Sequence, residues 1–125
     1  MVILLVEDDS SLLEVVRNIL EWQGYHVLTA RSFEQAKDQE ATFPGEINLL
    51  VTDFGLQSGN GLEVARYVRA RRPHVTVIFM SGQAPESILD PDDFQPGDSF
   101  ISKPFRLASL VNKVKALLNG SEVET

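Results

Sequence analysis

Short apolar segments alternate with longer amphipathic segments along the whole chain. Four of the apolar segments each predict a strand that is buried on both faces. A fifth segment is shorter and more mixed, but it follows Gly24 at the distance expected for a helix C-cap and a turn. The predicted strands are Val2–Val6, His26–Ala30, Ile47–Thr52, Val75–Met80 and Ser99–Ser102.

The segments between these strands carry a helical period. In the first of them, apolar residues between Leu12 and Leu20 form one face, and Ser11 with Glu14 fits a capping box at the helix start. Trp22 is expected to pack at the end of this helix. Further helices are predicted from Phe33 to about Glu40, from Leu62 to Arg71 and from Leu107 to Leu118.

The alternation of strands and helices predicts an α/β fold. Right-handed crossovers give an open, doubly wound parallel sheet of five strands in the order 2-1-3-4-5, with helices on both faces. In such sheets ligands bind outside the carboxyl ends of the strands. We therefore expect the functional site at that edge.

The length of 125 residues and the hydrophobic content of 43% suit one compact domain. We expect it to span residues 1–119, followed by a polar C-terminal tail at 120–125. The least regular segment is 83–97, where three prolines and three aspartates leave room only for a short helix near Pro85 to Leu89.

Polar side chains follow four of the predicted strands. Asp8 and Asp9 follow the first strand, Asp53 the third, Ser81 the fourth and Lys103 the fifth. Strands one and three are neighbours about 4.8 Å apart in the predicted order, so Asp8 or Asp9 would face Asp53. Two carboxylates ~4 Å apart at an effective dielectric of ~20 repel by roughly 4 kcal/mol. We therefore expect a bound cation to offset the charge of these carboxylates.

The chemistry of these side chains favours Mg²⁺ and phosphoryl transfer. All-oxygen ligands without histidine or cysteine suit Mg²⁺, which commonly pairs with a phosphate. Lys103 adds a positive charge that brings the pocket near neutrality, so a phosphoryl group can enter. Asp53 is the preferred nucleophile, because it stands alone at the end of a buried strand, whereas Asp8 and Asp9 are adjacent and better arranged to hold a metal.

Four motifs in this order resemble the receiver domain of two-component response regulators, a flavodoxin-like fold. They are Leu4-Leu-Val-Glu-Asp-Asp9, Leu49-Leu-Val-Thr-Asp53 with Gly61 eight residues on, Met80-Ser-Gly82 and Lys103-Pro-Phe105. The resemblance covers almost the whole chain. Ser81-Gly82 and the Lys-Pro-Phe ending are similar to receivers fused behind hybrid sensor histidine kinases.

The resemblance implies a role for each site residue. Asp53 would be phosphorylated, and Lys103, with a cis bond to Pro104, would bind the phosphoryl oxygens. Ser81 and Phe100 would form the switch that turns phosphorylation into a surface change. The implied Mg²⁺ ligands are Asp53, Asp9 directly, Asp8 largely through water, and the carbonyl of Gly55.

Two positions depart from the usual receiver pattern. Gln57 replaces a common proline. Phe100 lacks the hydroxyl that a tyrosine would offer, so its switch would rest on packing.

Charge and composition narrow the expected partners. A net charge of −7 would repel a phosphate backbone, which argues against direct nucleic-acid binding. The first strand is too short for a signal peptide or membrane span, so membrane insertion is not expected and the cytoplasm is the expected location. The resemblance implies a histidine kinase or a histidine phosphotransfer protein as phosphoryl donor, and a downstream protein target.

Other function classes fit the sequence less well. An aspartyl-phosphate phosphatase needs a second acid two residues after the nucleophile, where this chain has Gly55. Nucleotide or flavin binding needs a glycine-rich loop after the first strand. In this chain the strand is followed by three acids, which would repel a bound phosphate. We therefore expect a signalling domain that catalyses only its own phosphorylation and dephosphorylation. The alternative is a receiver-like module that binds proteins without being phosphorylated.

Overall fold

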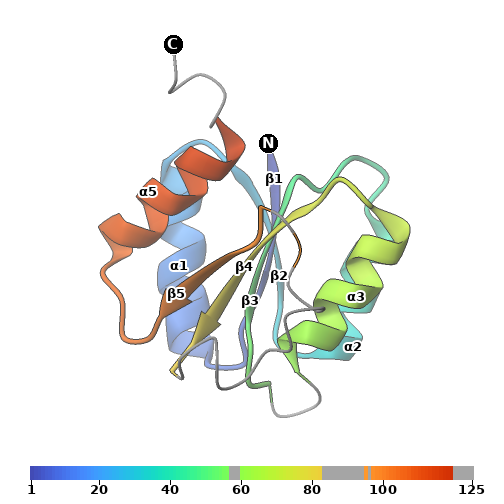
Figure 1. The fold of residues 1–125 in the computed structure, drawn as a ribbon, viewed down its shortest axis with the longest axis horizontal. Coiled ribbons are helices and arrows are strands. Elements are labelled where there is room, and N and C mark those ends of the chain that lie inside the picture. The colour runs from blue at the N-terminus through green and yellow to red at the C-terminus, as the bar shows by residue number, and fades with distance from the viewer. Residues whose placement is uncertain (57–59, 83–94, 96, 120–125) are drawn as a thin grey trace.

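Five parallel strands form the centre of the molecule, in the order β2-β1-β3-β4-β5 (Figure 1). The computed structural model describes residues 1–56, 60–82, 95 and 97–119; Gln57, the predicted helix near Pro85 to Leu89 and the tail at 120–125 lie outside them. The described elements are β1 (Val2–Val6), α1 (Ser10–Trp22), β2 (His26–Ala30), α2 (Phe33–Thr42), β3 (Leu49–Asp53), α3 (Gly61–Arg71), β4 (Thr76–Ser81), β5 (Ser99–Ser102) and α5 (Leu107–Leu118).

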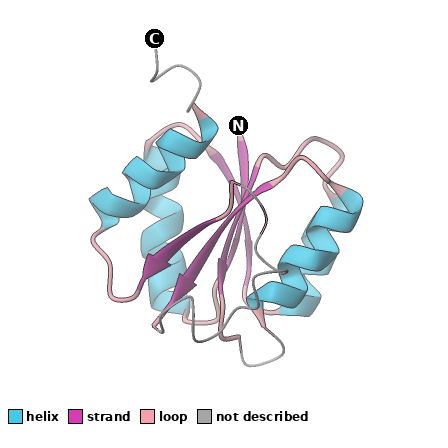
Figure 2. Ribbon diagram, in the orientation of Figure 1, coloured by secondary structure: helices cyan, strands magenta, loops and turns pink. Residues whose placement is uncertain are grey.

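Helices cover both faces of the sheet (Figure 2). α1 and α5 lie on one face and α2 and α3 on the other, and each face has its own cluster of buried apolar side chains. The three central strands, β1, β3 and β4, are almost wholly buried because their alternate side chains point into these two clusters. The edge strands β2 and β5 are only partly buried, so the prediction that Ser99–Ser102 is buried on both faces is wrong. The predicted strand order and the placement of helices on both faces are confirmed.

The third and fourth strands begin and end later than predicted. β3 starts at Leu49 because Asn48 is engaged with the start of β1: its side-chain Oδ1 accepts the N–H of Val2 at 2.8 Å and its own N–H donates to the Val2 carbonyl at 2.8 Å. β3 includes Asp53 and β4 includes Ser81. Each of these polar residues is therefore the last residue of its strand, at the carboxyl edge of the sheet.

The start of α1 differs from the predicted capping box. The N-cap is Asp9, whose Oδ1 accepts the backbone N–H groups of Ser11 (3.0 Å) and Leu12 (3.2 Å). Glu14 forms an ion pair with Arg17 instead of reaching back to the helix start. The prediction of Ser11 and Glu14 as a capping pair is therefore wrong, whereas the predicted turn at Gly24 is confirmed by its φ of 98°.

A buried ionic cluster joins the ends of α2 and α3. The side chain of Arg72 donates to the carbonyl oxygens of Glu40 (3.1 Å), Phe43 (3.0 Å) and Gly45 (2.6 Å), and its Nε donates to Glu40 Oε2 (3.2 Å). Arg71 Nε lies 2.6 Å from Glu40 Oε1, a contact without hydrogen-bond geometry. Because Glu40 is buried, these guanidinium groups supply the charge that water cannot.

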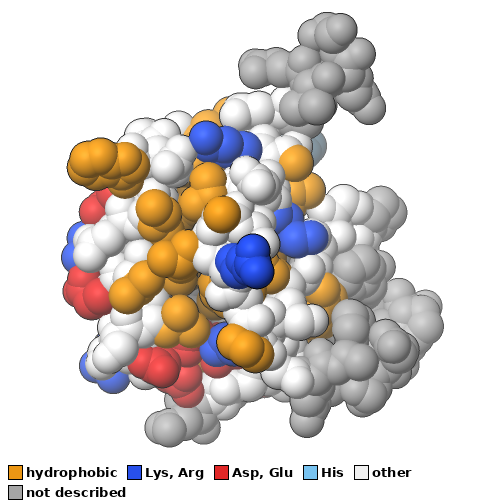
Figure 3. Space-filling view, turned by 90° about the vertical axis from the view of Figure 1, so that its left-hand side faces the viewer, with side chains coloured by type: hydrophobic (Ala, Val, Ile, Leu, Met, Phe, Trp, Pro, Cys, Tyr) orange, Lys and Arg blue, Asp and Glu red, His pale blue; other side chains and the backbone are white. Residues whose placement is uncertain are grey.

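The outer face of α1 and α5 carries apolar side chains that no described element covers (Figure 3). Trp22 is 84% exposed, so the expectation that it packs at the end of the helix is wrong. Beside it lies a hollow of about 340 Å³, lined by Val15, Asn18, Ile19, Trp22 and Leu107. No helix in the described part of the chain has the length and hydrophobicity needed to cross a membrane.

Candidate functional site

The polar residues that follow the strands converge at the carboxyl edge of the sheet, as predicted. Asp53 ends β3 and is 7% exposed, and Ser81 ends β4 and is 5% exposed. Glu7 follows β1 and is 1% exposed. Lys103 follows β5, and its backbone N–H donates to the Ser81 carbonyl at 2.8 Å. Four strands thus place their terminal polar groups around one point.

Three carboxylates lie close together at this edge of the sheet. Glu7, Asp8 and Asp53 each offer an oxygen atom, and these oxygens all lie within 4.8 Å of one another. At such separations the negative charges repel strongly in a partly buried site. An all-oxygen, all-carboxylate donor set fits a hard divalent cation such as Mg²⁺ and lacks the nitrogen and sulfur ligands that favour zinc.

Lys103 bridges two members of this acid cluster. Its Nζ lies 2.8 Å from Glu7 Oε1, to which it donates a hydrogen bond, and 3.3 Å from Asp53 Oδ1. The bond between Lys103 and Pro104 is cis, as the resemblance implied. The ammonium group therefore stands where it can contact both the proposed nucleophile and a group attached to it.

Burial and pairing perturb the pKa values of the two most closely paired groups. Burial raises the pKa of Glu7 above its ordinary value of 4.5, and the charge of Asp53 adds to the rise, although bonds from Lys103 and from the N–H of Asp9 oppose it. Burial alone would lower the pKa of Lys103, but the hydrogen bond and charge of Glu7, with the charge of Asp53, raise it above its ordinary value of 10.5. These two carboxylates therefore favour the charged form of Lys103.

Asp9, which sequence analysis placed among the metal ligands, lies outside the cluster. Its carboxylate is turned to the N-terminus of α1, where it accepts two backbone N–H groups. Glu7 takes the expected place of Asp9 beside Asp8 and Asp53. The prediction that Asp8 or Asp9 faces Asp53 is thus met by Asp8.

Sequence analysis missed Glu7 because Glu7 lies in a run of three acids, of which Asp8 and Asp9 were assigned to the metal. A signal was present, since Asp9 stands three residues before Leu12, at the distance of an N-cap from the first apolar position of the helix. Assigning Asp9 to the cap would have left Glu7 and Asp8 for the pocket.

Gly61 lets the start of α3 lie close against the backbone at the end of β3. Its N–H donates to the carbonyl of Phe54 at 2.8 Å. A Cβ atom at Gly61 would collide with the carbonyl oxygen of Asp53 and lie 3.0 Å from the Cα of Phe54. Gly55 is exposed, and a Cβ there would meet nothing within 4 Å. The close approach of the backbone therefore requires a glycine at position 61, whereas the described surroundings of Gly55 leave room for a side chain.

Comparison with known proteins finds similarity over most of the chain. The sequence profile of the response regulator receiver domain matches residues 3–115. The chain belongs to the response regulator receiver family.

Relatives of this receiver domain include both short and long proteins. It is 34% identical over 117 residues to the response regulator receiver protein CpdR of Brucella abortus, covering 93% of this chain and 95% of CpdR. It is 31% identical over 122 residues to the sensor kinase CckA of Brucella abortus, covering 96% of this chain and 13% of CckA. The chain spans about half the length of several other relatives.

Solved structures share the fold of this receiver domain. A response regulator receiver protein from Sinorhizobium medicae superposes with a TM-score of 0.83 at 29% identity, covering 95% of this chain and 94% of that one. The receiver domain is accordingly a signalling module of a two-component system.

The aromatic residue Phe100 lies in β5 within a cluster of three rings. Its ring centroid lies 5.4 Å from that of Phe79 and 6.5 Å from that of Phe54, the residue that directly follows Asp53. Phe79 is fully buried, whereas Phe54 and Phe100 are half-buried. The position that the resemblance assigns to the switch thus lies beside the side chain of the residue that directly follows Asp53.

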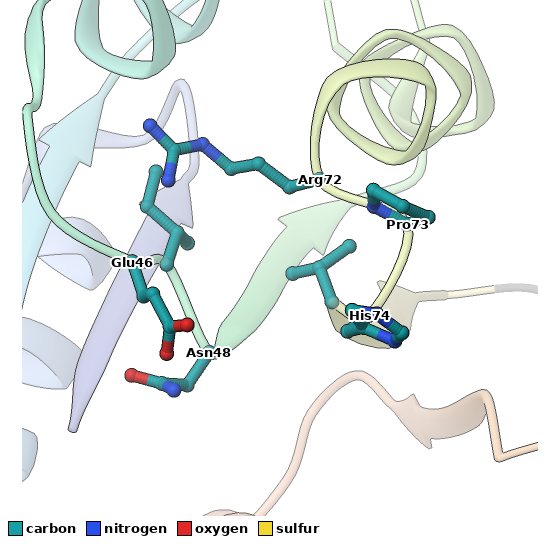
Figure 4. Close-up of a pocket in the computed structure, with 7 residues that line it drawn as sticks. Glu46, Asn48, Arg72, Pro73 and His74 are labelled. Carbon is teal, nitrogen blue, oxygen red and sulfur yellow. The ribbon is translucent and has the colours of Figure 1, made fainter.

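A second hollow of the receiver domain lies at the opposite edge of the sheet, beside the starts of β3 and β4 (Figure 4). It encloses about 230 Å³, with Glu46 and Asn48 on one side and Pro73 and His74 on the other. Arg72 also lines it. This hollow is separate from the acid cluster.

Proposed function

We propose that this receiver domain accepts a phosphoryl group on Asp53, with Mg²⁺ bound beside it. The observation that carries the proposal is the grouping of the Glu7, Asp8 and Asp53 carboxylates within 4.8 Å, with Lys103 Nζ 3.3 Å from Asp53 Oδ1. This combination of acids and one cation serves a reaction that brings more negative charge into the pocket.

Asp53 is the nucleophile in this proposal. One of its carboxylate oxygens attacks the phosphorus atom of a phosphohistidine donor, the P–N bond breaks, and the leaving imidazole takes up a proton. Lys103 stays charged throughout and donates to the transferred oxygens, because its pKa is raised by Glu7 and Asp53. The fixed position of Asp53 at the end of β3 supplies the orientation that the transfer needs.

The Mg²⁺ ligands in this proposal are Asp53, Asp8, the carbonyl of Gly55 and, directly or through water, Glu7. When bound, Mg²⁺ would offset the charge of the three carboxylates and of the entering phosphoryl oxygens. Asp9 is not a ligand in this arrangement, because its carboxylate is committed to the cap of α1.

Ser81 and Phe100 form the proposed switch. Ser81 follows Met80, which is the β4 partner of Asp53 in the parallel register, so Ser81 lies one residue beyond the position level with Asp53. A shift of the Ser81 hydroxyl toward the phosphoryl group would make room for the half-buried Phe100 to move inward against Phe79. The outcome would be a changed surface for a downstream protein.

The proposed donor is a histidine kinase or a histidine phosphotransfer protein, in the cytoplasm. The net charge of −7 supports a protein partner over nucleic acid. The domain would act on no other substrate, and hydrolysis of its own phosphoaspartate would end the signal.

Intact mass spectrometry after incubation with acetyl phosphate tests the proposal. The unmodified chain should gain one phosphoryl group only when Mg²⁺ is present, and Asp53→Asn should gain none. A known receiver domain treated in parallel is the positive control. If that control responds and this chain does not, the proposal fails and an unphosphorylated protein-binding module becomes the better description.

A further inference from the structure

Asp9 is tied both to the helix that follows it and to the acid cluster that precedes it. Its Oδ1 accepts the N–H groups of Ser11 at 3.0 Å and Leu12 at 3.2 Å, which closes the first turn of α1. Its own N–H donates to Glu7 Oε2 at 3.0 Å. One residue thus connects the N-terminus of α1 to the carboxylate that pairs with Lys103.

These bonds hold Asp8 from both sides. Glu7 precedes Asp8 and is fixed by burial and by Lys103, and Asp9 follows it and is fixed to α1. The carbonyl of Asp8 also accepts a bond from Arg31 Nη2 at 3.3 Å. With the backbone held in this way, the Cα–Cβ bond of Asp8 keeps its direction, which places the carboxylate within reach of Asp53.

We infer that Asp9 is a positioning residue of the phosphoacceptor site, holding Asp8 against Asp53 through its cap on α1. The inference rests on the proposed function, because it concerns the binding of Mg²⁺ by Asp8 and Asp53. The chain needs at Asp9 a side chain that accepts backbone N–H groups, and it does not need a third metal-binding carboxylate there. A cap and a ligand make different demands on the residue, so substitutions can separate them.

Two substitutions at Asp9 distinguish a cap from a ligand. Asp9→Ala removes both the carboxylate and the cap, and we expect it to weaken Mg²⁺ binding by about 10-fold, as loss of groups that orient metal ligands commonly does. Asp9→Ser removes the carboxylate but keeps an oxygen that caps helices as well as aspartate does. We expect Asp9→Ser to recover most of the lost affinity.

Isothermal titration calorimetry with MgCl₂ measures the affinity of each variant without any phosphoryl transfer. Hydrogen exchange of the Ser11 and Leu12 amides, followed by NMR, reports the cap directly: these amides should exchange faster in Asp9→Ala and remain protected in Asp9→Ser. The matched control is Ser32→Ala, which removes the N-cap of α2, where Ser32 Oγ accepts the N–H of Gln35 at 3.1 Å. It should leave Mg²⁺ affinity unchanged.

Five results are decisive. Weak binding by Asp9→Ala that Asp9→Ser restores supports the inference. Unchanged affinity in Asp9→Ala overturns it, as does Asp9→Ser binding as weakly as Asp9→Ala while its amides stay protected. An equal loss in Ser32→Ala also overturns it, because the effect would then be a general loss of helix stability. Absence of Mg²⁺ binding by the unsubstituted chain refutes the proposed function itself, and the inference with it.

Discussion

Replacing Arg72 should destabilise the domain far more than replacing an exposed arginine. Arg72→Ala removes one hydrogen bond to a buried carboxylate and three to the carbonyls of Glu40, Phe43 and Gly45. It also leaves the buried Glu40 carboxylate with Arg71 alone. Removing one partner of a buried ion pair costs about 3–5 kcal/mol of folding stability. Because Arg71 still contacts Glu40, we expect a loss at the lower end of this range, about 3 kcal/mol.

Thermal and urea unfolding followed by far-ultraviolet circular dichroism measure this loss. With an unfolding entropy of about 2.1 cal/mol/K per residue, a loss of ~3 kcal/mol lowers the Tm of this chain by roughly 11 °C. Arg72→Lys should recover less than half, because an ammonium group cannot bridge acceptors that a planar guanidinium reaches together.

Arg17→Ala is the matched control for Arg72→Ala. Arg17 forms ion pairs with Glu14 and Glu21 on the exposed side of α1, and such pairs contribute little to stability. A loss at Arg72 no larger than the loss at Arg17, or full rescue by Arg72→Lys, would refute the argument that the buried cluster joins α2 to α3.

The remaining predictions concern the acid cluster and the two glycines that follow β3. Gly61→Ala should lose about 1–3 kcal/mol in the free energy of unfolding, because its Cβ meets rigid backbone, whereas Gly55→Ala should change it little; equal urea midpoints would contradict this. Because the pKa of Glu7 is raised in the folded state, proton binding by Glu7 stabilises the fold in the absence of Mg²⁺. This stabilisation is fully present below pH 4.5 and is lost as the pH rises through the folded-state pKa. Glu7→Gln should therefore be more stable than the unsubstituted chain at pH 7. Urea unfolding should show that the difference in free energy of unfolding between the two proteins shrinks below pH 4.5, and a difference that grows in acid would refute the prediction. Mg²⁺ at a hundred times its dissociation constant should add about 2.7 kcal/mol to the stability of the unsubstituted chain and nothing to Asp8→Asn, and EDTA should reverse the gain.

The strands and helices could be predicted because each depends on a local pattern. The run from Val2 to Val6 gave the bounds of β1 correctly, and the apolar stripe from Leu107 to Leu118 gave those of α5. The start of β3 was set instead by bonds between Asn48 and Val2, which are 46 residues apart. No local pattern contains that information.

The site could be predicted as a group of residues but not in its detailed roles. Asp53 and Lys103 were found because each stands alone at the end of a strand. Which acids of the Glu7-Asp8-Asp9 run enter the pocket depends on where β1 ends and α1 begins, and the cap of α1 decides that point. The contact between Arg72 and Glu40 was also out of reach, because it requires the relative placement of two helices.

Trp22 is the single tryptophan of the chain, and its exposure determines what fluorescence can report. An indole that is 84% exposed in the folded protein is already surrounded by water, so its emission will change little when the chain unfolds. Tryptophan emission is for this reason a poor measure of stability here. The same indole will shift toward shorter wavelengths when another molecule covers the outer face of α1 and α5, so the chain carries its own spectroscopic label for binding at that face.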